Sequence, residues 1–131
     1  MQLKNPKWGF LTARLCYTEQ EDILFAADRG EKMLRHIITW NYGDGFTVEQ
    51  NKENALKIKE GFEALNNTID GLIEIKIYIN ELPTSSKDLI LTSLFESTEA
   101  LADYKADPNH KKVSAFVKTV LKNRACIDYY E

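Results

Sequence analysis

The sequence is poor in cysteine and proline, with two cysteines and three prolines in 131 residues. Cys16 and Cys126 have no spacing typical of a metal or redox motif, so we expect a reduced, cytoplasmic location. No window approaches the roughly 18 consecutive apolar residues of a membrane span. The first residues lack the positive-then-apolar layout of a secretory signal. We therefore expect a protein without disulfides that does not enter a membrane.

Several chemical signatures are also missing. With 17 Lys and Arg against 20 Asp and Glu, the net charge is −3, which argues against a nucleic-acid binder. The sequence contains no glycine-rich phosphate loop and no Ser-His-Asp order. Its two histidines, with Asp107 nearby, are too few to define a metal site. We expect neither a metal nor a cofactor.

What is present is one domain of ordinary composition, 44% hydrophobic and 28% charged, enough for a single core. Residues 1–32 hold apolar clusters but no sustained period, whereas every segment from Met33 onward has one. Our hypothesis is that Met33 is the natural start and that residues 1–32 are a misassigned or artificially added leader. The alternative is a genuine arm that packs on a sheet edge or a partner. The domain is then residues 33–131.

Four segments have the pattern of strands. Met33–Tyr42 is rich in β-branched and aromatic residues and alternates. Leu72–Glu81 alternates most clearly, Lys87–Glu96 returns after a turn as its hairpin partner, and Ala125–Glu131 closes the chain. The predicted apolar face of the second strand consists of Ile73, Ile75, Ile77 and Ile79. The first strand places one set of side chains on a common face: Leu34, His36, Ile38, Trp40 and Tyr42.

Three helices are expected between these strands. Thr47 and Gln50 fit a capping box that opens the first, and Ser97 caps a short second one. Asp107 and Pro108 are a favoured pair for starting the third, which we expect to end at Asn123-Arg124. The buried stripe of the first helix is predicted to be Ala55, Ile58, Phe62, Leu65 and Ile69. That of the third is predicted to be Val113, Phe116, Val117 and Val120.

The predicted order is β-α-β-β-α-α-β, an α+β ferredoxin-like arrangement with helices on one face of an antiparallel sheet. The second strand has one apolar and one mixed face, which indicates that helices cover the first. The mixed face must meet water or a second subunit.

The candidate site residues are His36, Tyr104 and His110. His110 lies near a helix N-terminus, which disfavours the charged ring, so a neutral histidine is available near pH 7. Tyr104 and His110 could act as an acid/base pair on a carbonyl substrate. The alternative is that all three are structural, with their polar atoms satisfied inside the core. The predicted walls of the pocket are Ile38, Trp40, Phe62, Val113 and Val117. Cys126 is expected to be inert packing.

Several stretches resemble one known family. They are Met33–Ile38, Asp70–Leu72, Phe95–Ser97 and, above all, Leu101–His110 (LADYKADPNH) with Ile127–Tyr129. Together they are similar to the stress-responsive A/B barrel (Dabb, dimeric α/β barrel) family.

This resemblance carries several implications. It implies a homodimeric barrel in which two copies pair through their sheets. A polyketide cyclase of the family uses histidines and tyrosines in its pocket, and the residues that resemble three of them are His36, Tyr104 and His110. A further histidine of that pocket falls at about Leu89 here, and Asp107 stands where family members often have histidine.

Three functional hypotheses follow. The first is a small dimeric protein of unassigned biochemical role that binds a hydrophobic or aromatic molecule between sheet and helices. The second is a cyclase, isomerase or monooxygenase-like enzyme acting on a carbonyl or polyketide-like compound through His36, Tyr104 and His110. The third is a purely structural stress protein. Whether the chain is an enzyme stays open at this point.

Overall fold

The computed structural model describes residues 32–131. Residues 35–129 form a compact unit, and the remaining described residues, 32–34, 130 and 131, belong to a second unit. In that second unit the Glu131 N–H donates to the Met33 carbonyl at 3.0 Å. The hypothesis of a leader over residues 1–32 lies outside the described residues, apart from Lys32 itself.

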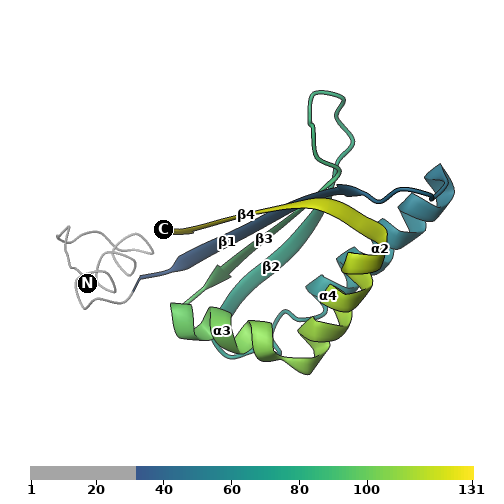
Figure 1. Cartoon of the computed structure of the whole chain (residues 1–131). Coiled ribbons are helices and arrows are strands. Elements are labelled where there is room, and N and C mark those ends of the chain that lie inside the picture. Colours follow the sequence, from purple (N-terminus) through teal and green to yellow (C-terminus); the bar gives the residue numbers. More distant parts are fainter. Residues whose placement is uncertain (1–31) are drawn as a thin grey trace. The chain divides into compact units, whose positions relative to one another are not determined.

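Four strands and three helices follow in the predicted order (Figure 1). Their bounds are β1 Leu34–Tyr42, α2 Val48–Glu63, β2 Leu72–Ile79, β3 Leu89–Phe95, α3 Thr98–Ala106, α4 Pro108–Val120 and β4 Leu121–Tyr130. The ferredoxin-like α+β fold is therefore confirmed.

The strands form one antiparallel sheet in the order β2-β3-β1-β4. The predicted hairpin is present, since Ile75 pairs with Ser93 and Ile77 with Leu91 across β2 and β3. All three helices lie on the same face of this sheet (Figure 1). Alternation along β3 turns one set of side chains toward the helices, and each is at most 1% exposed: Leu89, Leu91, Ser93 and Phe95.

The helices begin where their capping residues predict. The Gln50 N–H donates to Thr47 Oγ1 at 3.1 Å, and the Thr47 N–H donates back to Gln50 Oε1 at 2.9 Å. The side chains of Ser97 and Asp107 cap α3 and α4 by accepting backbone N–H groups of the first turn. The apolar stripe of α2 is buried through Ala55, Ile58 and Phe62, all at most 3% exposed. Ile69, predicted for this stripe, is half-buried in the turn beyond the helix.

The structure corrects two details of the predicted strands. A β-bulge between Leu72 and Glu74 turns Leu72 into the core, so Ile73 is 42% exposed rather than part of the apolar face. The third helix ends at Val120, and β4 starts at Leu121 rather than Ala125. The Gly43 N–H binds the Val120 carbonyl at 2.8 Å, which anchors this boundary to the end of β1.

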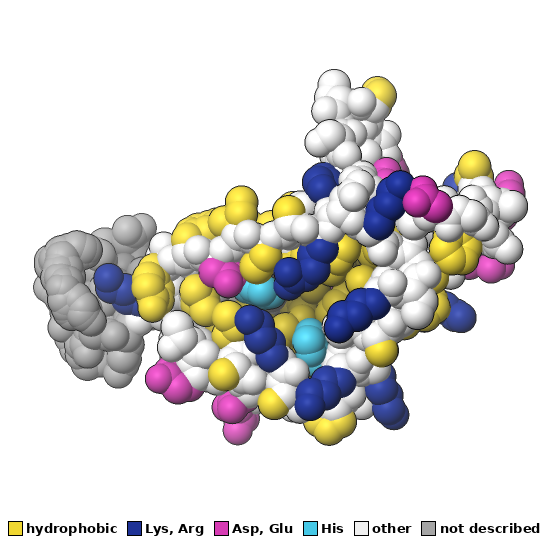
Figure 2. All heavy atoms as spheres, viewed as in Figure 1, with side chains coloured by type: hydrophobic (Ala, Val, Ile, Leu, Met, Phe, Trp, Pro, Cys, Tyr) yellow, Lys and Arg dark blue, Asp and Glu magenta, His cyan; other side chains and the backbone are white. Residues whose placement is uncertain are grey.

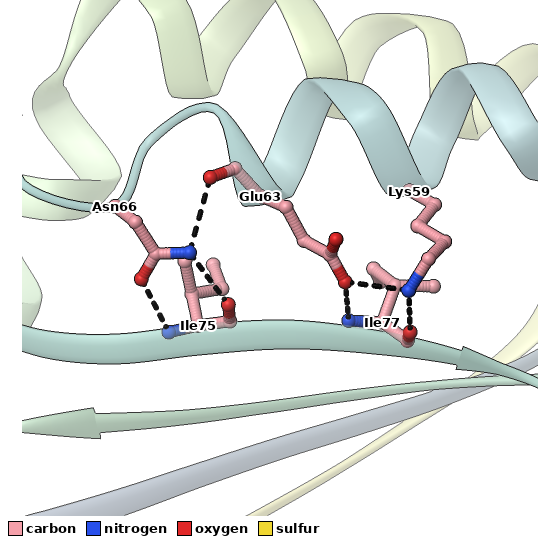
Figure 3. A network of polar contacts seen from close by, with 5 residues as sticks. All are labelled: Lys59, Glu63, Asn66, Ile75 and Ile77. Atoms are coloured by element: carbon pink, nitrogen blue, oxygen red, sulfur yellow. Dashed lines mark hydrogen bonds and ion pairs between the residues drawn. The ribbon is translucent and has the colours of Figure 1, made fainter.

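Side chains of α2 and the turn after it cover the outer edge of β2 (Figure 3). Asn66 pairs with Ile75 as a strand would, accepting from its N–H at 3.0 Å and donating to its carbonyl at 2.9 Å. Glu63 accepts the Ile77 N–H at 3.0 Å, while Lys59 donates to the Ile77 carbonyl at 2.9 Å. Backbone groups that could pair with another chain are thereby occupied.

The sheet face opposite the helices carries exposed apolar side chains. Four of them are 42% to 61% exposed: Ile73, Tyr78, Ile127 and Tyr129. Arg35 lies on the same face and bonds to both Glu74 and Thr92 at 3.1 Å. In the described part of the chain, no helix has the length and apolar character needed to cross a membrane.

Replacing Asn66 by alanine tests the closure of the β2 edge. Both backbone groups of Ile75 lose their partner, so we expect Asn66→Ala to lower the free energy of unfolding by about 1–2 kcal/mol in urea denaturation. Asn109→Ala is the control, because the hydrogen bond of Asn109 to the Asp107 cap uses its backbone. Equal stability of the two variants would contradict this role of Asn66.

Candidate functional site

A pocket of about 490 Å³ opens between the helices and the β1–β4 side of the sheet. Its size is in the range of small-molecule sites. Apolar side chains form much of its wall: Ile38, Trp40, Phe62, Val117 and Leu121. The polar groups at the pocket are His36, Tyr104, His110, Ser114 and Asn123, with four cations, Lys105, Lys118, Lys122 and Arg124. Figure 2 shows the two histidines in a hollow bordered by basic side chains.

His36 lies on β1 at the floor of this pocket and is 1% exposed. Ser93 donates to its carbonyl at 3.0 Å, which ties the backbone there to β3. The Nδ1 of His36 is hydrogen-bonded to the carboxylate of Asp128 on β4. A carboxylate only accepts, so the proton is on Nδ1 and Nε2 of the neutral ring is free to accept.

The charge state of His36 is set by opposing effects. Burial lowers the pKa of His36 from its ordinary value of 6.5, the hydrogen bond and charge of Asp128 raise it, and the charges of Lys105 and Arg124 lower it again. Burial prevails, so the ring is neutral at pH 7.

Tyr104 and His110 flank the break between α3 and α4. Asp107 Oδ2 accepts the N–H groups of Asn109 and His110 at 3.1 and 3.2 Å, which fixes the turn. The ring centroids of Tyr104 and His110 are 4.2 Å apart. Tyr104 is 1% exposed, and this burial raises the pKa of its phenol above the ordinary value of 10.0. The phenol therefore keeps its proton and can donate a hydrogen bond.

His110 has an unsatisfied nitrogen. Burial lowers the pKa of His110, while the backbone of Lys105 and the charge of Asp107 oppose the effect. Among the described residues, His110 Nδ1 is buried without any hydrogen-bond partner. An unpaired buried polar atom costs about 1–3 kcal/mol.

Most of the predicted pocket residues come together, and one does not. His36, Tyr104 and His110 line the same cavity, along with Ile38, Trp40, Phe62 and Val117. Val113, predicted as a wall, instead faces α2, where a Cβ built on Gly61 would lie 2.9 Å from its Cγ2. Glycine at position 61 is what lets the two helices approach there. Leu89, where the resemblance places a further histidine, is buried in β3 at 1% exposure.

Two residues of β4 were missed by the sequence reasoning. Cys126 was expected to be inert packing, but it is exposed, so the packing part of that prediction is wrong. Its Sγ lies 3.8 Å from His36 Nδ1 and 3.7 Å from Asp128 Oδ1. Alternation along the last strand, which puts Arg124, Cys126 and Asp128 on one face, was the available signal.

His36, Cys126 and Asp128 are also the residues best placed to hold a metal ion. Their potential ligand atoms lie within 4.8 Å of one another, and imidazole, thiolate and carboxylate suit a transition metal such as zinc. The expectation of no metal site rested on the two histidines with Asp107, on carboxylates scattered over solvated faces and on the spacing of the cysteines. It stays a prediction.

The family model described as "Stress Responsive A/B Barrel Domain" matches residues 34–131. The chain belongs to this family. No curated protein sequence matches the chain. The predicted family membership is thus confirmed over the whole patterned part of the sequence.

Solved structures agree with this fold. A dimeric protein of unknown function with a ferredoxin-like fold from Bacteroides fragilis is 26% identical, with a TM-score of 0.71, over 76% of this chain and 96% of that one. A protein from Arabidopsis thaliana is 25% identical, with a TM-score of 0.58, over 73% and 92%. A hydroxynitrile lyase from Passiflora edulis is 14% identical, with a TM-score of 0.63, over 76% and 94%. That last likeness shows the fold alone.

The contacts of the two histidines can be tested separately by NMR titration. Because Asp128 favours the charged form of His36, Asp128→Asn should lower the pKa of His36 further and leave that of His110 almost unchanged. Asp107→Asn should lower the pKa of His110 instead, since asparagine still caps a helix well. If Asp128→Asn leaves the His36 titration where it was, the contact does not exist in solution.

Proposed function

We propose that the protein binds a small, largely apolar molecule in the pocket between its sheet and helices. The observation that carries this proposal is an apolar cavity of about 490 Å³ onto whose wall two histidines and a tyrosine converge, His36, His110 and Tyr104. Apolar walls with a few convergent polar groups are the usual form of a ligand site.

The wall of the pocket suits an aromatic ligand. The rings of Trp40 and Phe62 are stacked, with centroids 6.2 Å apart and an interplanar angle of 22°. A flat ring entering the pocket can add to this stack or meet it edge-on. His110 and the Tyr104 hydroxyl would then orient the ligand through hydrogen bonds.

The second candidate is an enzyme that moves a proton next to a carbonyl group. It is supported by the two protonation states at the break, a neutral imidazole beside a protonated phenol 4.2 Å away between centroids. His110 would take a proton from the carbon next to the carbonyl while Tyr104 donates a hydrogen bond to the carbonyl oxygen. His36, oriented by Asp128, would face the same substrate. Consumption of a bound carbonyl compound by the native protein but not by His110→Gln would favour this candidate.

We also propose that two copies pair through the uncovered face of the sheet. The support is the set of exposed apolar side chains on that face and the Bacteroides fragilis relative, which is described as dimeric. Exposed apolar surface of this kind is typical of an interaction site.

Filling the pocket should abolish binding. Ser114 lines the cavity, and Ser114→Phe would occupy it while leaving the histidines and Tyr104 in place. In a Trp8→Phe background Trp40 is the remaining tryptophan, so its emission reports on the pocket. We expect a neutral aromatic probe, 2-naphthamide, to quench that emission and raise the melting temperature, and both effects to vanish in Ser114→Phe.

Ala115→Phe is the matched control, because Ala115 is the exposed neighbour of Ser114 on α4. It should bind the probe as the parent does. Absence of quenching and of a thermal shift in the parent, with a panel of aromatic probes, would leave the structural hypothesis standing instead.

A charge on the uncovered sheet face should separate the copies. Ile127 and Leu82 are 61% and 65% exposed, but only Ile127 lies on that face. We expect Ile127→Lys to sediment as a monomer and Leu82→Lys as a dimer, because a buried lysine in an interface is strongly unfavourable. A parent protein that is monomeric at micromolar concentration would refute the pairing.

A further inference from the structure

Basic side chains are concentrated around the pocket, although the chain as a whole carries a net negative charge. The net charge is −3, yet Lys105, Lys118, Lys122 and Arg124 line the cavity, and no Asp or Glu of residues 32–131 is in its lining. They come from three elements, the last turns of α3 and α4 and the start of β4. In Figure 2, basic side chains border the hollow that holds the histidines.

Most of these cations form no ion pair within the described residues. Lys122 donates to Asp44 at 2.6 Å, but over residues 32–131 neither Lys105, Lys118 nor Arg124 forms an ion pair. Lys105 and Lys118 lie in the last turns of their helices, where a positive charge stabilises the helix, and this accounts for their presence. Arg124 lies on a strand, so helix stabilisation does not account for its presence. Its charge and that of Lys105 both act on His36.

We propose that the natural ligand is an organic acid, with an apolar and preferably aromatic body in the cavity and a carboxylate held by Lys105 and Arg124. This inference rests on the proposed binding function and names its ligand class. A guanidinium matches a carboxylate with two parallel hydrogen bonds. The same anion would relieve the repulsion between the cations at the rim.

The test compares 2-naphthoate with its uncharged isostere 2-naphthamide in the Trp8→Phe background. We expect the carboxylate to bind at least about tenfold more tightly, as a charge-assisted pair should, and the difference to shrink with added salt. Naphthoate should also raise the pKa values of His36 and His110, since a nearby anion favours the charged ring. Naphthamide should leave both titrations in place.

The variants separate a specific contact from general attraction. Lys105→Gln/Arg124→Gln should erase the preference for naphthoate, and unchanged binding of naphthamide would show that its pocket is intact. Lys111→Gln/Lys112→Gln removes the same charge from exposed positions outside the lining and should keep the preference. Equal affinities of the parent for the two probes, or equal losses in the two double variants, would overturn the inference. Failure of both probes to bind would instead count against the proposed function.

Discussion

The helix layer is narrower than the sheet it covers, and the pocket exists because of this mismatch. Helix α2 packs against β2, and α3 against β2 and β3, while α4 packs against the other two helices. Phe62 of α2 also stacks on Trp40 of β1. Beyond Leu121 every residue of β4 is exposed. The cavity therefore lies at the margin of the layer, where β1 is still covered and β4 is not. A histidine with 1% exposure can consequently touch an exposed aspartate and an exposed thiol.

The turn at Asp107 links this architecture to its chemistry. Asp107 caps α4 with its carboxylate and ends α3 with its backbone N–H, which donates to the Tyr104 carbonyl. The two aromatic rings on either side of this break lie against each other. The protonation states of the site also come from its packing. Burial keeps Tyr104 protonated and both histidines neutral, so the donor and the acceptor are prepared before any ligand arrives. The charge of Lys105 lowers the pKa of both histidines further, whereas that of Arg124 opposes the effect of burial on the pKa of Tyr104.

The sequence predicted which residues share a face of a helix or strand. It did not predict the bulge in β2, the start of β4 or the contacts between distant elements. Periodicity placed His36, Ile38 and Trp40 together, and capping residues located all three helix starts. The bulge after Leu72 shifts the faces by one residue without any change in composition, so Ile73 was misassigned. Leu121 continues an apolar helical pattern although the chain has already turned into β4. The partnership of Asp128 with His36, 92 residues away, and the gathering of four cations depend on tertiary proximity, which a single sequence does not encode locally.

The occupied edge of β2 has a consequence for how copies of this chain can add to one another. Endless stacking of sheets side by side needs two available borders per molecule, one to receive and one to offer. Asn66, Glu63 and Lys59 take up the backbone groups of Ile75 and Ile77 at one border. Edge-to-edge pairing with another copy is thus left to the opposite edge of the sheet, β4. Once β4 has paired with one other strand, its backbone groups are no longer available. Association of that kind terminates at a pair, so a fibre cannot propagate by this route.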